Sequence, residues 1–138
     1  MRSKFATAIN CIDGRAQIPA LDWIRLHLNV EYVDLITEPG ADKILALETE
    51  LASAIRTKAE FSARVHDPVA VTIAGHHDCL ANPVSREEHI EQIRGAVKTI
   101  HCWRIVDRAV GIWVNECGWV DLVVDTEAKG KAISYLRL

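Results

Sequence analysis

The chain has 138 residues, of which 49% are apolar and 25% charged, a balance typical of a folded protein rather than a disordered one. Its formal net charge of −3 leaves no basic surplus, which argues against nucleic-acid binding. No apolar run approaches the ~18 residues that span a bilayer, and four cysteines are too few for a disulfide scaffold. We therefore expect a single domain over residues 1–138, located in the cytoplasm with its thiols reduced.

The first third of the chain alternates strand and helix patterns. Residues 5–11 form a short, mostly apolar run typical of a buried strand. A loop that contains Gly14 and Pro19 follows, and apolar residues spaced three or four apart over 21–28 then predict a short helix. Residues 31–37 predict a second strand, which ends before a Pro-Gly pair.

The middle of the chain predicts one long helix and one strand. Asp42 is the expected N-cap of a helix whose apolar stripe continues to about Val65, before Pro68 ends it. Residues 69–74 are uncharged and rich in β-branched side chains, and they give the strongest strand pattern in the chain.

The last third predicts a capped helix and a hairpin. Ser85 and Glu88 have the spacing of a capping box, and the helix that they open carries an apolar face up to Ile100. Two strand patterns follow, over 108–114 and 119–124, and the four residues between them favour a tight turn.

These elements alternate as β-α-β-α-β-α-β-β, which predicts an α/β fold with helices on both faces of a mostly parallel sheet. Right-handed crossovers restrict the strand orders, and we expect the order 2-1-3-4 with an antiparallel edge strand 5.

Reactive side chains concentrate directly after two of the predicted strands. One segment is residues 11–15 (CIDGR), and the other is residues 75–79 (GHHDC). Each lies at the carboxyl end of its strand, and the two strands are neighbours in the expected order. The chain winds away from them in opposite directions, which defines the switch point where open α/β sheets bind ligands.

Cys11, His76 and Cys79 supply two soft sulfurs and one imidazole, a donor set that suits zinc. His76 and Cys79 are close enough for one loop to supply both, while Cys11 comes from the adjacent strand. Three protein ligands leave one tetrahedral position open, which is typical of a catalytic zinc site.

The pattern Cys-x-Asp-x-Arg after a first strand, with His-x-x-Cys after a third, resembles the β-class carbonic anhydrases. The resemblance implies Zn²⁺ bound by Cys11, His76 and Cys79, with Asp13 and Arg15 as the catalytic dyad. It also implies reversible hydration of CO2 to bicarbonate through a zinc-bound hydroxide, and assembly as a homodimer. If the Asp13–Arg15 pair broke, Asp13 could bind zinc itself and block the site.

Other functions remain open at this point. The same site could act on a different small substrate, COS or CS2, or the domain could hold zinc in a non-catalytic structural or regulatory role. A structural site would need a fourth ligand, from Cys102 or Cys117. A cysteine nucleophile that wraps an oxyanion is disfavoured, because only three residues separate Cys11 from Arg15.

Several residues carry weaker expectations. Cys102 is expected to be a packing residue and Cys117 a turn residue. His77 is either a solvent-facing loop histidine or a proton relay, and Asp78 either caps a helix or orients a ligand. The remaining histidines are expected on helix surfaces, at His27, His66, His89 and His101.

Overall fold

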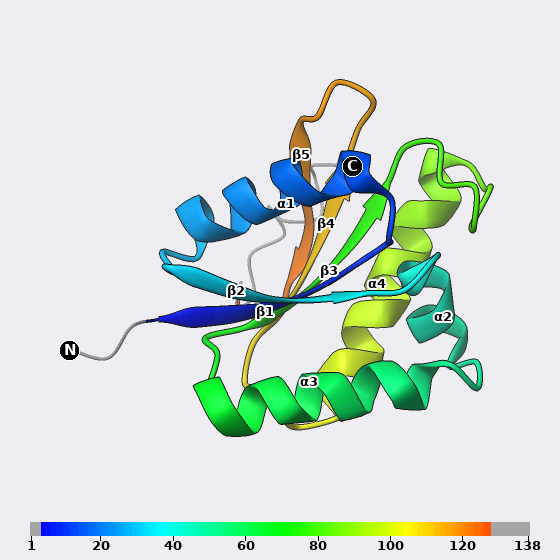
Figure 1. Cartoon of the computed structure of the whole chain (residues 1–138). Helices are drawn as coiled ribbons and strands as arrows, with labels where there is room; N and C mark the ends of the chain where they lie inside the picture. Colours follow the sequence, from blue (N-terminus) through cyan, green and yellow to red (C-terminus); the bar gives the residue numbers. More distant parts are fainter. Residues whose placement is uncertain (1–3, 128–138) are drawn as a thin grey trace.

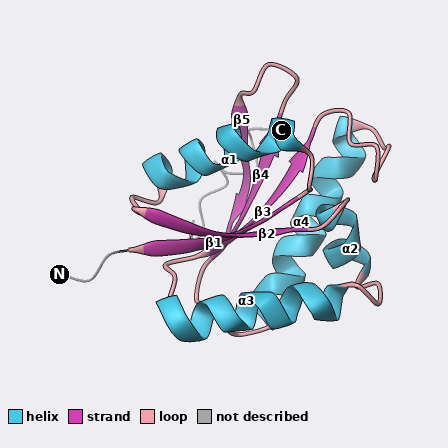
Figure 2. Cartoon of the chain, in the orientation of Figure 1, coloured by secondary structure: helices cyan, strands magenta, loops and turns pink. Residues whose placement is uncertain are grey.

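The computed structural model of the protein describes residues 4–127. Within this range the elements are, in chain order, β1 (Phe5–Asn10), α1 (Gly14–His27), β2 (Tyr32–Thr37), α2 (Ala41–Leu47), α3 (Ala52–His66), β3 (Val71–His76), α4 (Arg86–Cys102), β4 (Ala109–Val114) and β5 (Val120–Asp125). Figure 1 shows how these elements are arranged, and Figure 2 separates helices from strands by colour.

The strands form one five-stranded sheet of order β2-β1-β3-β4-β5. The first four strands are parallel, and β5 pairs with β4 in the antiparallel direction. This confirms the predicted α/β fold and its strand order. No helix among the described residues is long and apolar enough to cross a membrane.

Helices cover both faces of the sheet, as Figure 1 shows: α1 lies on one face, and α2, α3 and α4 lie on the other. Side chains alternate along each strand, so β1 directs Ala8 toward α1 and Ile9 toward the opposite helices. The α1 side of the core uses many small residues, whereas the other side is rich in isoleucine. The two apolar clusters shield both faces of the sheet from water. Only the loops lie at the ends of its strands.

Helix α1 begins at Gly14, earlier than the predicted start near residue 21. Asp13 is the N-cap, because its carboxylate accepts a hydrogen bond from the backbone N–H of Arg15 at 2.8 Å. Pro19 therefore lies inside the helix rather than in a loop. The prediction of a loop was wrong. Proline usually interrupts a helix, but the cap at Asp13 starts this helix before Pro19.

The predicted helix from Asp42 to Val65 is in fact two helices, α2 and α3. The break follows Leu47, where Glu48 adopts a left-handed backbone conformation with φ 49°. Asp42 is not an N-cap; it lies inside α2 and is buried. The apolar stripe is misleading because Leu47 and Leu51, which continue it on paper, are exposed at the break.

Two local predictions in the second half are confirmed. The side chain of Ser85 accepts a hydrogen bond from the backbone N–H of Glu88 at 3.1 Å, so Ser85 caps α4. A turn held by Asn115 joins β4 to β5 as a hairpin. The expectation for His89 was wrong: this histidine is buried on the inner face of α4, not exposed on its surface.

Gly111 of β4 provides a test of the packing between the sheet and α4. A Cβ at this position would overlap the side chain of Ile93 and lie 3.0 Å from Val97. We expect Gly111→Ala to lower the free energy of unfolding by about 1–3 kcal/mol. The matched control is Gly14→Ala, where a Cβ meets nothing within 4 Å, and which should shift stability by less than about 0.5 kcal/mol. Urea denaturation would measure both; equal stabilities of the two variants would contradict this packing.

Candidate metal centre

Direct pairing of β1 with β3 brings two distant segments of the chain together. The strands are parallel and pair Ile9 with Ile73, so the residues just beyond them emerge at the same edge of the sheet. Cys11 follows the last residue of β1, while His76 ends β3 and Cys79 lies in the next loop. All three side chains are buried, and their ligand atoms lie within 4.8 Å of one another.

The imidazole of His76 is oriented for a ligand. Its Nδ1 is 2.8 Å from the carbonyl oxygen of His77, and because a carbonyl can only accept, Nδ1 must donate. The other ring nitrogen, Nε2, then carries a free lone pair. It is buried and has no hydrogen-bond partner. A metal ligand histidine has this arrangement, with one nitrogen held by the backbone and the other left to coordinate.

The two cysteines face each other closely. The Sγ atoms of Cys11 and Cys79 are 3.8 Å apart, and neither cysteine is in a disulfide. Burial, together with the proximity of Cys11, raises the pKa of the Cys79 thiol to about 11. Without a cation, the pocket therefore disfavours the thiolate that metal binding requires.

This donor set fits zinc. Two thiol sulfurs and one imidazole nitrogen match the ligands that Zn²⁺ prefers, and a buried nitrogen without a partner is otherwise a cost. Among residues 4–127, no fourth histidine, cysteine or carboxylate joins the group. A three-ligand set leaves a coordination position open.

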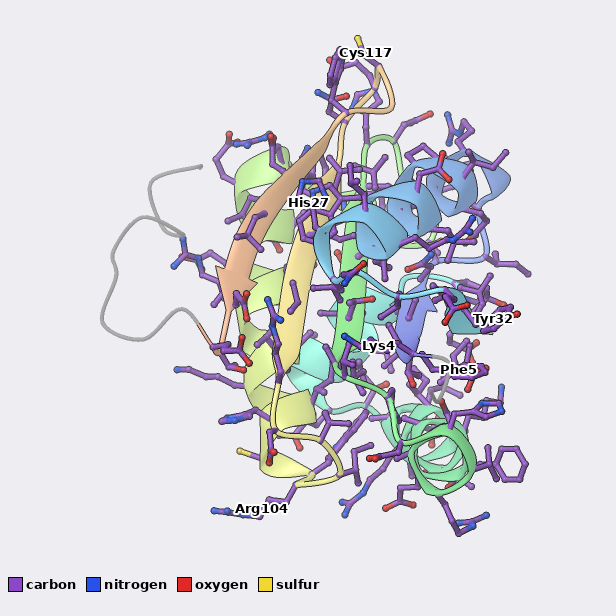
Figure 3. The ribbon with its side chains drawn as sticks, turned by 90° about the vertical axis from the view of Figure 1, so that its left-hand side faces the viewer. Lys4, Phe5, His27, Tyr32, Arg104 and Cys117 are labelled. Atoms are coloured by element: carbon purple, nitrogen blue, oxygen red, sulfur yellow. The ribbon has the colours of Figure 1, made fainter. Side chains whose placement is uncertain are left out.

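The other two cysteines lie elsewhere and are exposed. Figure 3 shows Cys117 at the tip of the β4–β5 hairpin and Arg104 at the opposite end of the molecule. Cys102 ends α4, two residues before Arg104. Cys117 is thus the turn residue that was predicted, whereas Cys102 is exposed and is not the packing residue that we expected.

Asp13 and Arg15 form an ion pair beside the cluster. Arg15 donates from Nη2 to Asp13 Oδ2 at 2.7 Å and from Nε to Oδ1 at 3.1 Å, a two-pronged pair. Hydrogen bonds from the side chain and the backbone N–H of Arg15 hold the pKa of the Asp13 carboxyl well below its usual range. Asp13 is therefore a carboxylate at neutral pH.

Asp78 and Gln17 complete the local framework. Arg15 Nη1 donates to Asp78 Oδ2 at 3.3 Å and Nη2 to the Asp78 carbonyl at 3.1 Å, which ties the first loop to the loop of His76 and Cys79. Gln17 Nε2 donates to the carbonyls of Cys11 and Asp13. Asp78 thus holds Arg15, which is neither of the two roles considered for it, a helix cap or the orientation of a ligand. No sequence pattern marked Gln17.

A small cavity of about 140 Å³ adjoins the cluster. Arg15, His76 and His77 line one side, and the β4–β5 hairpin lines the other through Asn115 and Glu116. A larger groove of about 550 Å³ lies between β2 and α3, but it contains none of the cluster residues. We therefore associate the chemistry with the smaller cavity, which is sized for a molecule of few atoms.

Comparisons with known proteins identify the family and the fold. A protein-family model described as "Putative carbonic anhydrase" matches residues 1–124. No curated protein matches the chain significantly by sequence.

Solved structures show the same fold. A tetrameric β-carbonic anhydrase from the filamentous ascomycete Sordaria macrospora superposes with a TM-score of 0.64 at 11% identity, over 91% of this chain and 84% of that one. A carbonic anhydrase from Glaciozyma antarctica gives 0.59 at 14% identity, over 89% and 83%. A β-carbonic anhydrase of the fungal pathogen Aspergillus fumigatus gives 0.54 at 16% identity, over 96% and 80%.

The raised pKa of Cys79 predicts how metal affinity depends on pH. With a pKa of about 11 the thiol is protonated near neutrality, so zinc must displace its proton. We expect the apparent zinc affinity to rise about tenfold per pH unit, between pH 6 and 8, for each proton displaced. Competition with a chromophoric chelator would measure it. Cys102→Ser should keep this slope, and an affinity independent of pH would contradict the prediction.

Proposed function

Because the chain is a divergent member of the β-carbonic anhydrase family, we propose that it catalyses zinc-dependent reversible hydration of CO2 to bicarbonate. The observation that carries this proposal is the buried cluster of Cys11, His76 and Cys79, in which His76 Nε2 has no partner. The absence of a fourth ligand among the described residues favours an open, catalytic position over a closed structural site.

A zinc ion held by these three residues would lower the pKa of water toward neutrality and so supply a hydroxide nucleophile for CO2. The two sulfurs would offset the charge of the ion and weaken this effect. Groups outside the ligand set must therefore help to hold and aim the nucleophile.

Asp13 is the group best placed to aim it. Its Oδ1 already accepts two hydrogen bonds from Arg15, whereas Oδ2 accepts one and retains a free lone pair. Oδ2 can therefore accept a hydrogen bond from the attacking water and fix the direction of its remaining lone pair. Because the pKa of Asp13 is depressed, its carboxylate accepts the hydrogen bond from the water without taking up the proton.

Arg15 holds Asp13 and adds a positive charge at the mouth of the cavity. The cavity of about 140 Å³ admits CO2 and linear molecules of similar size, and it excludes drug-sized ligands.

We further propose that the chain forms a homodimer in a reducing compartment such as the cytoplasm. One structural neighbour is tetrameric. Large apolar side chains beside the site, at Ile12, Leu80 and Trp119, are exposed in the single chain and would be covered by a second copy. The cluster needs both cysteines as free thiols, which a reducing compartment preserves.

The role of the Asp13 carboxylate in catalysis can be distinguished from a general effect of removing a negative charge. We expect Asp13→Asn to lower kcat for CO2 hydration about 100-fold while zinc content stays unchanged, because the amide loses the anionic acceptor that aims the nucleophile. Asp22→Asn makes the same chemical change on an exposed residue of α1 and should leave kcat unchanged. Stopped-flow measurement with a pH indicator would report both variants.

The same assay tests the proposed function itself. Wild-type protein with stoichiometric zinc that fails to hydrate CO2 at alkaline pH would overturn it. Offering COS and CS2 to the same preparation would show which of these linear molecules is the better substrate.

Assembly can be tested at Trp119. We expect Trp119→Glu to shift the wild-type dimer toward monomer, because a buried charge opposes association. Leu26→Glu changes an equally exposed leucine on α1 and should leave the dimer intact. Light scattering coupled to gel filtration would give the masses, and a monomeric wild-type chain would rule out the dimer.

A further inference from the structure

A buried polar network lies behind the metal centre and outside the catalytic group. Its centre is the hydrogen bond between Asp42 of α2 and His89 of α4, in which His89 Nδ1 lies 2.6 Å from Asp42 Oδ2. Both side chains are 2–3% exposed. Asn82, from the loop between β3 and α4, donates from Nδ2 to Asp42 Oδ1 at 3.1 Å and to Gln92 Oε1 at 2.6 Å.

The stability of the fold does not by itself account for this network. Removing a carboxylate from water costs several kcal/mol, and well-packed apolar side chains of similar volume often serve a core as well or better. The α2–α4 interface is mainly apolar, with Ile44, Ile90 and Ile93 in one cluster. A polar network retained in such a place points to a positional role.

The part of the chain that this network holds is the loop that carries Cys79. Across residues 77–85 only Cys79 and Asn82 are buried, while the residues around them are exposed or half-exposed. The backbone N–H of Asn82 donates to the carbonyl of Cys79 at 3.2 Å. The loop is therefore anchored at two points, the metal ligand itself and an asparagine three residues later.

The network also contacts the strand that ends in His76. A Cβ added at Gly75 would lie 2.7 Å from Asp42 Oδ2, so the carboxylate packs directly against the backbone beside this histidine. Asp42 thus touches the β3 backbone with one oxygen and holds Asn82 with the other.

We infer that Asn82, held by Asp42 and Gln92, is a positioning residue that fixes the loop of Cys79 and so presets the metal centre. This inference rests on the proposed zinc site. Residues that orient ligands from behind typically change metal affinity 10–100-fold when they are removed. Asn82 acts on Cys79 through the backbone rather than by touching the metal.

The test uses Co²⁺ as the probe, added to the full chain after metal removal. Cobalt accepts the same sulfur and nitrogen ligands, and its visible absorption reports both the thiolate bonds and the geometry. We expect Asn82→Ala to lower Co²⁺ affinity about 10–100-fold and to alter the visible spectrum of the loaded protein. Asp42→Asn keeps the side-chain volume and removes the charge, and it should shift affinity in the same direction.

The matched control is Ser62→Ala. Ser62 of α3 is also buried and hydrogen-bonded, to Thr7 and Asp34, but it lies outside the loop and its anchors. Its loss should reduce thermal stability while leaving Co²⁺ affinity and spectrum as in the wild type. A loss of affinity in this control equal to that of Asn82→Ala would show a general stability effect and overturn the inference.

The remaining outcomes distinguish this inference from the proposed function. Wild-type protein that binds no Co²⁺ would overturn the metal site and the proposed function with it. Wild-type protein that binds Co²⁺, together with Asn82 and Asp42 variants of equal affinity and unchanged spectrum, would overturn the positioning role alone. If Asn82→Ala does not fold, Asp42→Asn decides the question by the same two readouts.

Discussion

The parallel pairing of β1 with β3 is the constraint on which the rest of this molecule depends. Neither segment holds a metal alone: the first offers one sulfur, and the second offers one sulfur and one imidazole. Only the register that sets Ile9 beside Ile73 brings Cys11 within 3.8 Å of Cys79. The hydrophobic clusters on both faces of the sheet hold that register. The free energy gained by burying apolar side chains therefore brings the three candidate metal ligands together.

Charge is balanced locally around this junction. Two thiols that ionise on metal binding would offset the charge of the ion, and the carboxylate of Asp13 would add one negative charge beside them. Arg15 offsets part of that charge and joins both loops by bonding to Asp13 and Asp78. The side chain of Arg15 is 59% exposed and that of Asp13 is 22% exposed, so solvent screens this pair more than the buried ligands. The cluster of Cys11, His76 and Cys79 is buried, whereas the Asp13–Arg15 pair is partly exposed to solvent.

The sequence could predict the strands, their order and the meeting of Cys11 with His76 and Cys79, because strand patterns and strand ends are local and the switch-point rule is general. It could not predict what depends on tertiary neighbours. Asp42 resembles a helix cap in its local sequence. His89 lies four residues before Ile93, on the apolar face of its helix, but histidine is a residue type that is mostly found at least partly exposed. Each is buried only because the other lies opposite it, 47 residues away along the chain. Such a pair has no signature in either segment alone.

The polar groups near the site are of two kinds, those exposed at the surface and those buried in the core. Arg15, at the start of α1, and Asp78, in the loop after β3, interact at the surface, where water can replace either partner at little cost. Asp42, Asn82 and His89 interact in the core, where an unpaired group would cost far more and where the geometry is accordingly strict. The loop of Cys79 is thus held rigidly from the core side and loosely from the solvent side. If the cluster binds zinc as we propose, a loop held in this way would keep the geometry of the metal ligands while the solvent-facing groups remained free to adjust to a substrate.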